Sequence, residues 1–482
     1  MTGLKVLSFR WILLGCIGAL VVFQSVDVFL SYRAAASSAA LATHRRAFRP
    51  LKAPDDNDLL HMNQLMTDCL TKGEAIISWR YMQPPLWRDS AAKDVLAEIL
   101  RCPEAEVFLP VGIRSHGYCE DAMAYVKFLE TRAMPYWVYE EAFHIDGKEY
   151  SYHDLCPHTA VILMNHYWDG LPDRHDFPKT KKLVLMPNVE MHDLKAAHYH
   201  RVDYVLAKTK DSYKRITNWY ISTSSECALT SGAPCRYSQE GNNPRHTQVY
   251  FTMHTSSDPT VLTKEAARTD PVAFTPAERN WHNLTIFHAN GHSTLKNTIE
   301  VLDCWASRPD LPPISIYSSD GGSNDTYWRL HRDGNPLRHV DYHSGEFVSP
   351  PVYGKLLLET TVILFGHYIN QARASGALVV TTDGAPMNEF IDESSGVLIQ
   401  GVTPRGDVLM GTGTEFHVDH KHICATMDRV LALTPSERAA RAAEGQRRYF
   451  EQMAYFRTAM KSFQKLLRWQ LTPPRNDTSS TT

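Results

Sequence analysis

The stretch FGHYINQARASGALVVTTDGAPMNEFIDESSGVLI, residues 365–399, decides the fold. It opens with a helical segment that ends at Gly376, a residue type favoured just past the last turn of a helix. Residues 377–382 are a short apolar, β-branched run, typical of a strand buried on both faces. Residues 383–386 form a turn that leads into a helix carrying Glu389. Ligands bind beyond the carboxyl ends of strands in open α/β sheets, so this stretch predicts a Rossmann-type domain and one wall of its site.

The same alternation of strands and helices extends to both sides of this stretch. Further buried-strand runs lie at residues 107–111, 160–164, 182–186, 204–207 and 284–288. Helical segments separate them, which predicts parallel βα units in two series. Residues 436–469, rich in Arg, Ala, Glu and Gln, predict one or two long helices. The fold class is therefore α/β.

Composition and the amino-terminal sequence limit the possible settings. The chain has 482 residues, 43% of them hydrophobic, and a net charge of −3, so nothing requires a nucleic-acid partner. Residues 11–23 are an unbroken apolar run, which residues 24–30 prolong to about the 20 residues that span a bilayer. A cleaved signal peptide and a signal anchor are both compatible with this run. The lack of an A-x-A site favours the anchor, and either places the following residues in the secretory lumen.

Cysteines and glycosylation sequons fit that compartment. Of nine cysteines, Cys16 lies in the apolar run and eight remain, an even number suited to disulfides. Cys227 and Cys235 bracket a short loop and could form one of them. No CxxC pair is present, so a structural zinc site is not expected. Sequons occur at Asn283, which abuts a predicted strand, and at Asn324 and Asn476; Asn324 is the best loop candidate.

A phosphate-binding pattern follows the strand at residues 284–288. Gly291 allows a close approach of the backbone, and Ser293 or Thr294 could cap a helix over residues 298–306. His292 and Lys296 lie in the same turn. A helix N-terminus beside a lysine is suited to a diphosphate, although an ordinary capped turn would have the same pattern.

Residues 365–389 also resemble a known signature. The arrangement F-G-x4-Q-A-x-A-x-G-A-x-V-V-T-T-D-x-x-P-x-N-E is similar to the donor site of retaining, two-Rossmann (GT-B) glycosyltransferases of the group 1/family 4 type. The resemblance implies two Rossmann-like domains facing across a cleft, with a C-terminal helix crossing back. It also implies that Lys296 binds the donor diphosphate and that Glu389 contacts the donor sugar. The family's two acidic positions are here Ile363 and Gln371, and the residue at the second contacts the nucleotide ribose.

The expected site combines both halves. Loops after strands of the first half supply His116 and Glu190 as catalytic candidates together with Glu389, while His192 and Lys208 are further reactive groups. The residues expected to bind the nucleotide sugar are Gly291, His292, Lys296, Gln371, Ala385, Pro386, Met387, Asn388 and Glu389. No metal and no cofactor beyond the nucleotide-sugar co-substrate is expected.

The predicted organisation follows from these patterns and the resemblance. It comprises a cytoplasmic tail (1–10), a transmembrane signal anchor (11–31), a stem with leading helices (32–105), an acceptor domain (106–262), a linker (263–282), a nucleotide-sugar domain (283–445), a C-terminal helix (446–470) and a polar tail (471–482). The function implied is transfer of a sugar, with retention, to a glycan or glycoprotein by a single-pass type II membrane protein of the secretory pathway, in the Golgi. The alternative is an inactive sugar-binding or scaffold protein with a decayed donor site, since Ile363 and Gln371 replace acidic residues.

Overall fold

The structure is a computed structural model of the chain. It describes residues 51–72, 74–189, 194–221, 245–332, 337–346, 348–365, 368–408 and 413–471. The predicted cytoplasmic tail and anchor lie outside these ranges, as do Glu190, His192, Cys227, Cys235 and Asn476. Within the ranges, no helix has both the length and the apolar character needed to cross a bilayer.

The first sheet and its helices form what is here called the N-terminal half. The sheet has seven strands in the order β1-β3-β2-β6-β7-β8-β9, and only β1 runs antiparallel to its neighbour. The strands are β1 (Ile77–Ser78), β2 (Ala105–Phe108), β3 (Arg132–Met134), β6 (Ala160–Met164), β7 (Leu183–Met186), β8 (Tyr204–Ala207) and β9 (Gln248–Phe251). The bounds predicted for β6 and β8 are confirmed.

Helices pack on both faces of this sheet. They are α2 (Asp56–Thr71), α3 (Ala92–Ile99), α4 (Tyr118–Phe128), α5 (Tyr152–Leu155), α6 (Ala196–Tyr199) and α7 (Lys210–Ile221), with 3-10 turns η1 (Val111–His116), η2 (Tyr136–Tyr139) and η3 (Leu171–Asp173) and a hairpin of β4 (Ala142–Ile145) and β5 (Lys148–Ser151). Along β6, Ile162 and Met164 join one core cluster and Val161 and Leu163 the other. A strand buried on both sides needs a continuous apolar run, which is why the sequence revealed it.

The second sheet and its helices form the C-terminal half. Its six strands are all parallel, in the order β12-β11-β10-β13-β14-β15. They are β10 (Ile286–Gly291), β11 (Ile314–Ser318), β12 (Val340–Ser344), β13 (Val362–Leu364), β14 (Leu378–Thr382) and β15 (Val397–Ile399). In chain order this is the 3-2-1-4-5-6 arrangement of a Rossmann sheet, so the expected α/β class with parallel sheets is confirmed.

The helices of the C-terminal half again cover both faces of their sheet. They are α10 (Thr298–Ser307), α11 (Gly321–Arg332), α12 (Pro350–Glu359), α13 (Ile369–Ser375), α14 (Met387–Phe390) and α15 (His420–Ala432), with the 3-10 turn η4 (Thr294–Lys296) and a hairpin of β16 (Thr403–Val408) and β17 (Gly413–His417). The segment expected to be a linker, residues 263–282, instead contains most of α8 (Thr260–Thr269) and all of α9 (Pro271–Phe274). Helix α8 packs against α12 and α2.

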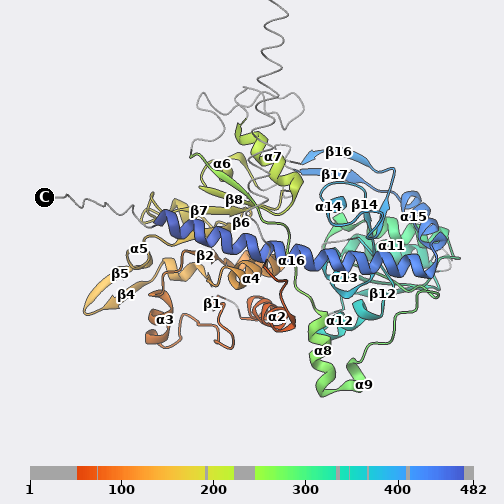
Figure 1. Cartoon of the computed structure of the whole chain (residues 1–482), viewed down its shortest axis with the longest axis horizontal. Helices are drawn as coiled ribbons and strands as arrows, with labels where there is room; N and C mark the ends of the chain where they lie inside the picture. The colour runs from red at the N-terminus through yellow and green to blue at the C-terminus, as the bar shows by residue number, and fades with distance from the viewer. Residues whose placement is uncertain are drawn as a thin grey trace, which may run out of the picture. The chain divides into compact units, whose positions relative to one another are not determined.

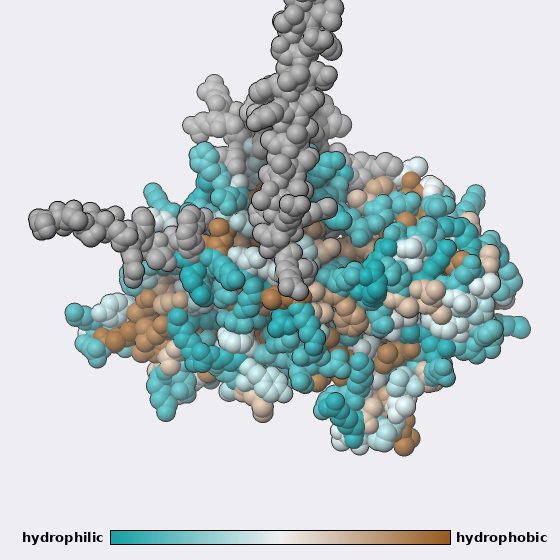
Figure 2. Space-filling view, viewed as in Figure 1, coloured by the Kyte–Doolittle hydropathy of each residue, from teal (hydrophilic) through white to brown (hydrophobic). Residues whose placement is uncertain are grey.

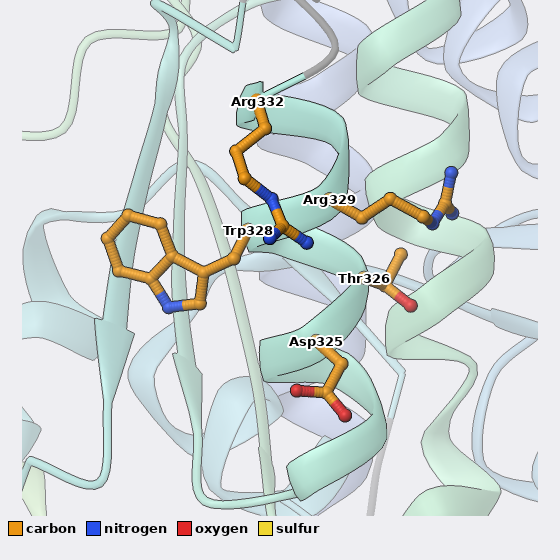
Figure 3. Close-up of a pocket in the computed structure, with 5 residues that line it drawn as sticks. All are labelled: Asp325, Thr326, Trp328, Arg329 and Arg332. Carbon is orange, nitrogen blue, oxygen red and sulfur yellow. The ribbon is translucent and has the colours of Figure 1, made fainter.

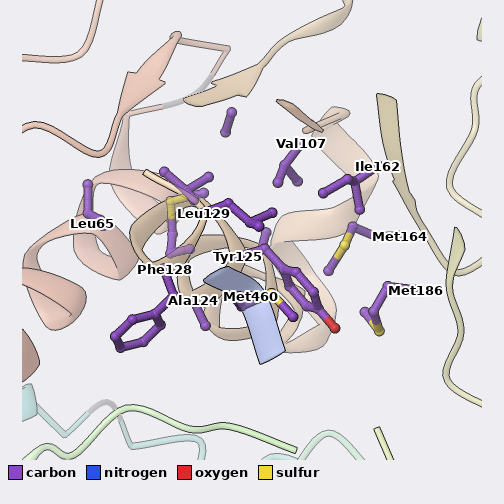
Figure 4. Close-up of a cluster of buried hydrophobic side chains, with 14 of the residues drawn as sticks. Leu65, Val107, Ala124, Tyr125, Phe128, Leu129, Ile162, Met164, Met186 and Met460 are labelled. Atoms are coloured by element: carbon purple, nitrogen blue, oxygen red, sulfur yellow. The ribbon is translucent and has the colours of Figure 1, made fainter. Parts of the chain in front are cut away.

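A single long helix ends the described chain. Helix α16 (Pro435–Leu471) packs against α13 and β14 of the C-terminal half and against α4 of the N-terminal half (Figure 1). Its Phe456 and Met460 join the core cluster that contains Tyr125 and Phe128 of α4 (Figure 4). The expected crossing helix is therefore present and completes the core of the first half.

The guanidinium of Arg279 fastens two helix ends of the C-terminal half. It donates hydrogen bonds to the carbonyl oxygens of Leu357 and Thr360 at the end of α12, at 2.7 and 2.6 Å. It also donates to Ser375 and Gly376 at the end of α13, at 3.1 and 2.7 Å. Carbonyl groups at helix ends lack partners within the helix, so one partly buried side chain satisfies both ends.

Disulfides join three cysteine pairs among the described residues: Cys69–Cys119, Cys102–Cys156 and Cys304–Cys424. The sequons differ from expectation. Asn324 lies inside α11 and accepts a hydrogen bond from Tyr342 at 2.7 Å, whereas Asn283 is exposed. In the view of Figure 2 the described surface is mainly hydrophilic, with hydrophobic residues scattered over it.

Candidate functional site

The order of the second sheet fixes where a ligand is expected. The order reverses between β10 and β13, and ligands of open α/β sheets bind outside the carboxyl ends of the strands at this switch point. Tyr368 joins the two strand ends there. Its hydroxyl accepts a hydrogen bond from the backbone of Ala289, at 2.8 Å, and donates one to the carbonyl of Leu364, at 2.5 Å. These two hydrogen bonds hold the ring of Tyr368 at the switch point.

The side chain of Lys296 lies over the ring of Tyr368. Its Nζ lies 5.6 Å from the centre of the Tyr368 ring, and the side chain is partly exposed. Burial lowers the pKa of Lys296 to about 8, because a desolvated ammonium is disfavoured. No carboxylate among the described residues forms an ion pair with it. A desolvated cation without a counter-ion among the described residues, at the switch point of a Rossmann sheet, is suited to an anionic group.

His288 lies near Lys296 and is neutral. Burial, and then the charge of Lys296, lower its pKa to about 4, while its hydrogen bond to the Leu364 carbonyl raises it. Nδ1 lies 3.1 Å from that carbonyl and Nε2 lies 2.9 Å from the hydroxyl of Thr298. A carbonyl only accepts, so Nδ1 carries the proton. His288 thus holds β10, β13 and the start of α10 together without adding charge.

The turn that carries Lys296 differs from the capped turn that the sequence suggested. Gly291 has a φ of +57°, a conformation that suits glycine. Thr294 lies in η4, and the residue before α10 is Asn297, with a φ of +54° and no side-chain cap. Neither Ser293 nor Thr294 therefore caps the helix. His292 is exposed in this turn.

The turn after β14 is packed closely. A Cβ on Gly384 would lie 2.6 Å from the ring of Phe416, so only glycine fits. Ala385, Pro386 and Met387 follow it, each partly exposed. The backbone N–H groups of the next two residues are used locally: Asn388 donates to the Gly384 carbonyl at 3.2 Å and Glu389 to that of Pro386 at 3.0 Å. The side chain of Asn388 donates to Asp383, at 3.1 Å.

The carboxylate of Glu389 reaches the other half of the protein. It accepts hydrogen bonds from the backbone N–H groups of Lys210 and Asp211, at 2.6 and 2.7 Å. These groups open α7, where the helix dipole favours a negative charge. In this structure Glu389 therefore caps a helix of the N-terminal half, and its expected contact with a donor sugar stays a prediction.

Gln371 also bonds across the two halves. Its Nε2 donates to Oε1 of Glu120 at 3.0 Å and to the hydroxyl of Ser257 at 3.2 Å, and its Oε1 accepts from Tyr353 at 3.0 Å. Both amide hydrogens are thereby used, so the expected ribose contact stays a prediction that depends on Oε1 alone. Ile363, at the other departure from the acidic pair, lies in the core of β13 and is fully buried.

Sequence reasoning missed Glu120 and Tyr353 as site residues. Glu120 lies in the first turn of α4, where an acidic residue is ordinary because of the helix dipole. Tyr353 lies in α12, outside the 365–389 signature. Only their contacts with Gln371, 251 and 18 residues away, reveal that they line the junction of the two halves.

The N-terminal half has its own switch point, between β2 and β6. The loop that carries the catalytic candidate His116 follows β2 there and forms η1 with the start of α4. Gly112 is in van der Waals distance of the Tyr167 ring, where a Cβ would lie 3.4 Å away. His116 ends η1, and its side chain lies outside the described part of the structure. Lys208 forms an ion pair with Asp121 at 2.8 Å, which gives it a structural partner.

A separate hollow of about 570 Å³ lies along α11, lined by Asp325, Thr326, Trp328, Arg329 and Arg332 (Figure 3). Trp328 and Arg329 project to different sides of the helix in this view. None of the residues expected to bind a nucleotide sugar lines it. In the described part of the chain, no group of three or more His, Cys, Asp or Glu residues is placed to hold a metal ion.

Comparisons with known proteins gave matches among solved structures. No family model matches the chain, and no curated protein does. A glycosyltransferase from Rickettsia africae ESF-5 overlaps 76% of this chain and 98% of its own, with a TM-score of 0.46 and 11% identity. A UDP-forming α,α-trehalose-phosphate synthase from Burkholderia vietnamiensis overlaps 65% and 75%, with a TM-score of 0.43 and 12% identity.

A third similar structure is an Anabaena protein in complex with UDP and glucose. It overlaps 64% of this chain and 92% of its own, with a TM-score of 0.34 and 13% identity. The structures that this chain resembles thus include glycosyltransferases. At these scores and identities the similarity carries no information on the chemistry of this chain, which depends on its own residues.

Proposed function

We propose that this chain is a glycosyltransferase that uses a nucleotide diphosphate sugar and transfers the sugar to a glycan or glycoprotein. One observation carries the proposal: Lys296 is a desolvated cation without an ion-pair partner among the described residues, at the switch point of a Rossmann sheet. A nucleotide diphosphate fits this place because its charge balances the lysine. The signature over residues 365–389 includes β14 and the turn at the carboxyl end of that strand, at the same edge of the sheet. It supports a sugar donor over a nucleotide without a sugar.

The chemistry asks for charge stabilisation at the leaving group. As the bond between the sugar and the diphosphate breaks, negative charge grows on the diphosphate oxygens. The ammonium of Lys296 stabilises that charge, and its partial desolvation strengthens the contact. The acceptor hydroxyl enters from the N-terminal half. Retention of the anomeric configuration is part of the proposal and rests on the resemblance of the signature.

The proposed setting is the lumen of the secretory pathway, in the Golgi, with a single-pass type II anchor. Three disulfides among the described residues support an oxidising compartment, since such bonds are rare in the cytosol. The apolar run at residues 11–30 supports the anchor.

A second candidate function is a sugar-binding or scaffold protein without transfer activity. Gln371 and Glu389 favour it, because both side chains are engaged in hydrogen bonds between the halves. A scaffold would bind a nucleotide sugar and leave it intact.

The test uses the full-length protein and a panel of UDP- and GDP-sugars. Binding is measured by calorimetry, and cleavage of the donor by release of free nucleotide diphosphate. We expect one donor to bind, and Lys296→Met to weaken it by about 1.5–3 kcal/mol, the value of a hydrogen bond to a charged group. Lys421→Met, an exposed lysine of the same half, is the matched control.

The outcomes separate the candidates. Binding that is sensitive to Lys296, followed by donor cleavage and transfer, supports the transferase. Binding without cleavage in the presence of glycan acceptors supports the scaffold. If no nucleotide sugar binds, both are wrong.

A further inference from the structure

Glu120 holds three parts of the chain together through one carboxylate oxygen. Its Oε1 accepts hydrogen bonds from the backbone N–H of Ser257 at 2.5 Å, from the Ser257 hydroxyl at 2.7 Å and from Nε2 of Gln371 at 3.0 Å. Glu120 belongs to α4 of the N-terminal half, Gln371 to α13 of the C-terminal half, and Ser257 to the segment that connects them. Three donors converging on Oε1 fix the carboxyl group in one orientation.

The hydrogen bonds between Glu120, Ser257 and Gln371 are called the joint below. The other oxygen of Glu120, Oε2, takes no part in it. No hydrogen bond joins it to any described residue, and Glu120 forms no ion pair with a described Lys, Arg or His. The side chain is partly exposed, although desolvation is the largest cause that raises its pKa. Its hydrogen bonds from Ser257 and Gln371 lower the pKa, and the charge of Asp121 raises it.

The joint alone does not explain a carboxylate. Three donors on one oxygen could equally be satisfied by the oxygen of an amide, without the cost of burying a charge. The titratable groups near Glu120 are Asp121 on its own helix, Tyr353 on α12 and Tyr449 on α16, and none of them supplies a positive charge. An open acceptor oxygen on a desolvated acid is suited to a ligand that donates a hydrogen bond.

A continuous set of contacts leads from Glu120 to Lys296. Gln371 bonds to the Tyr353 hydroxyl at 3.0 Å. The rings of Tyr353 and Tyr368 both pack against Phe287, with centroids 6.1 and 6.0 Å away. Lys296 lies over Tyr368. These contacts connect Glu120 to the switch point where Lys296 lies.

We propose that Glu120 binds a sugar hydroxyl through Oε2, next to the diphosphate held by Lys296. A hydroxyl donates to a carboxylate in a short, charge-assisted hydrogen bond, which is how carboxylates recognise sugars. The hydroxyl belongs to the donor sugar or to the acceptor sugar, and both present the same chemistry. The inference rests on the proposed function, and it adds a substrate-contacting residue to the N-terminal half.

The test compares Glu120→Gln with the wild-type full-length protein. Glutamine keeps an oxygen for the three donors but puts an NH2 group where Oε2 was, so the fold is retained and the open acceptor is lost. Ser257→Ala is the matched control, because it removes one bond of the joint and leaves Oε2 in place. Affinities are measured for the nucleotide diphosphate alone and for its sugar, and kcat/KM is measured for the acceptor.

We expect Glu120→Gln to bind the nucleotide diphosphate as the wild type does. If the donor sugar supplies the hydroxyl, affinity for the nucleotide sugar falls about 10- to 100-fold. If the acceptor supplies it, donor affinity is unchanged and kcat/KM for the acceptor falls by a similar factor. Ser257→Ala should lower Tm while keeping both quantities near the wild-type values.

Two results would overturn the inference in distinguishable ways. If the wild type binds a nucleotide sugar and Glu120→Gln matches it in donor affinity and acceptor kcat/KM, Glu120 is a structural joint only and the proposed function stands. Losses in Ser257→Ala as large as those in Glu120→Gln lead to the same conclusion. If the wild type binds no nucleotide sugar, the proposed function fails and takes this role of Glu120 with it.

Discussion

The carboxylate of Glu389 accepts a hydrogen bond from the backbone N–H of Asp211, 178 residues earlier in the chain, at 2.7 Å. The neighbouring N–H of Lys210 binds its other oxygen at 2.6 Å. A residue expected to contact the donor sugar thus serves as the cap of a helix in the opposite half. If the donor draws the carboxylate of Glu389 away from α7, donor binding is coupled to movement between the halves.

That coupling gives the first prediction. Adding the donor identified by calorimetry should speed hydrogen exchange at the amides of Lys210 and Asp211, because their acceptor is withdrawn. Glu389→Gln should weaken the cap and lower the free energy of unfolding by about 1 kcal/mol, the usual value of a helix cap. Glu278→Gln, an exposed glutamate, is the control. Slower exchange at both amides on donor binding would show that Glu389 stays on the helix.

Gln371→Glu tests the joint with Glu120. The variant would place a second carboxyl group about where the amide donor lies, 3.0 Å from Oε1 of Glu120. Two carboxyl groups this close retain a shared proton, so the folded-state pKa of one rises further above its unfolded value. The folded state then binds more protons than the unfolded state, and the stability of the variant falls as pH rises above the ordinary glutamate range.

Thermal unfolding from pH 5 to pH 8 measures this effect. The Tm deficit of Gln371→Glu against wild type should widen as pH rises. Gln371→Met, which removes the donors without adding an acid, should show a deficit that depends little on pH. Parallel Tm curves for the two variants would show that residue 371 and Glu120 do not meet.

Lys296 makes binding of a nucleotide diphosphate dependent on pH. Its pKa of about 8 means that the free protein loses the charge as pH rises through that value. The anion prefers the charged form, so affinity should be constant below about pH 7 and fall by up to about tenfold per pH unit above pH 8. Lys296→Arg should flatten the profile, because a guanidinium keeps its proton. A falling profile that is unchanged in Lys296→Arg would assign the titration to another group.

Arg279→Met should destabilise the C-terminal half. The substitution leaves the carbonyl groups at the ends of α12 and α13 without the donors that now satisfy them. Hydrogen bonds to a charged group are worth about 1.5–3 kcal/mol, so a loss of about 3 kcal/mol or more is expected in the free energy of unfolding by urea. Arg268→Met removes an exposed arginine paired with Glu265 and should cost under about 1 kcal/mol. Equal losses would refute the role of Arg279.

The sequence predicts the strands well where burial on both faces demands an apolar run. β6 and β14 are of this kind. Gly291 and Lys296 could be predicted as site residues because they lie at and after the end of another such strand, β10. Local sequence patterns gave a wrong prediction where the backbone forms a different structure from the expected loop. The Gly321-Gly322-Ser323 run suggested a loop around Asn324, but Asp320 accepts hydrogen bonds from the backbone and hydroxyl of Ser323 and starts α11 there.

The sequence did not reveal which residues of the N-terminal half meet Gln371. Glu120, Ser257 and Gln371 are separated by 137 and 114 residues along the chain, and no short pattern marks residues that meet over such distances. Gln371 looked like a loss of function against the resembled family. Its amide in fact supplies the donor that a buried carboxyl group requires, which only the packing of the two halves could show.

The position of helix α16 at the end of the described chain determines when the N-terminal half can complete its core during synthesis. Phe456, Met460 and Phe463 of this last helix sit in the same core as α4, which was synthesised more than 300 residues before. While the ribosome is still making the second sheet, α2, β2 and β3 can pack on α4, but the part of α4 that α16 covers is still exposed. The core of the first half therefore becomes complete only when nearly the whole chain has emerged.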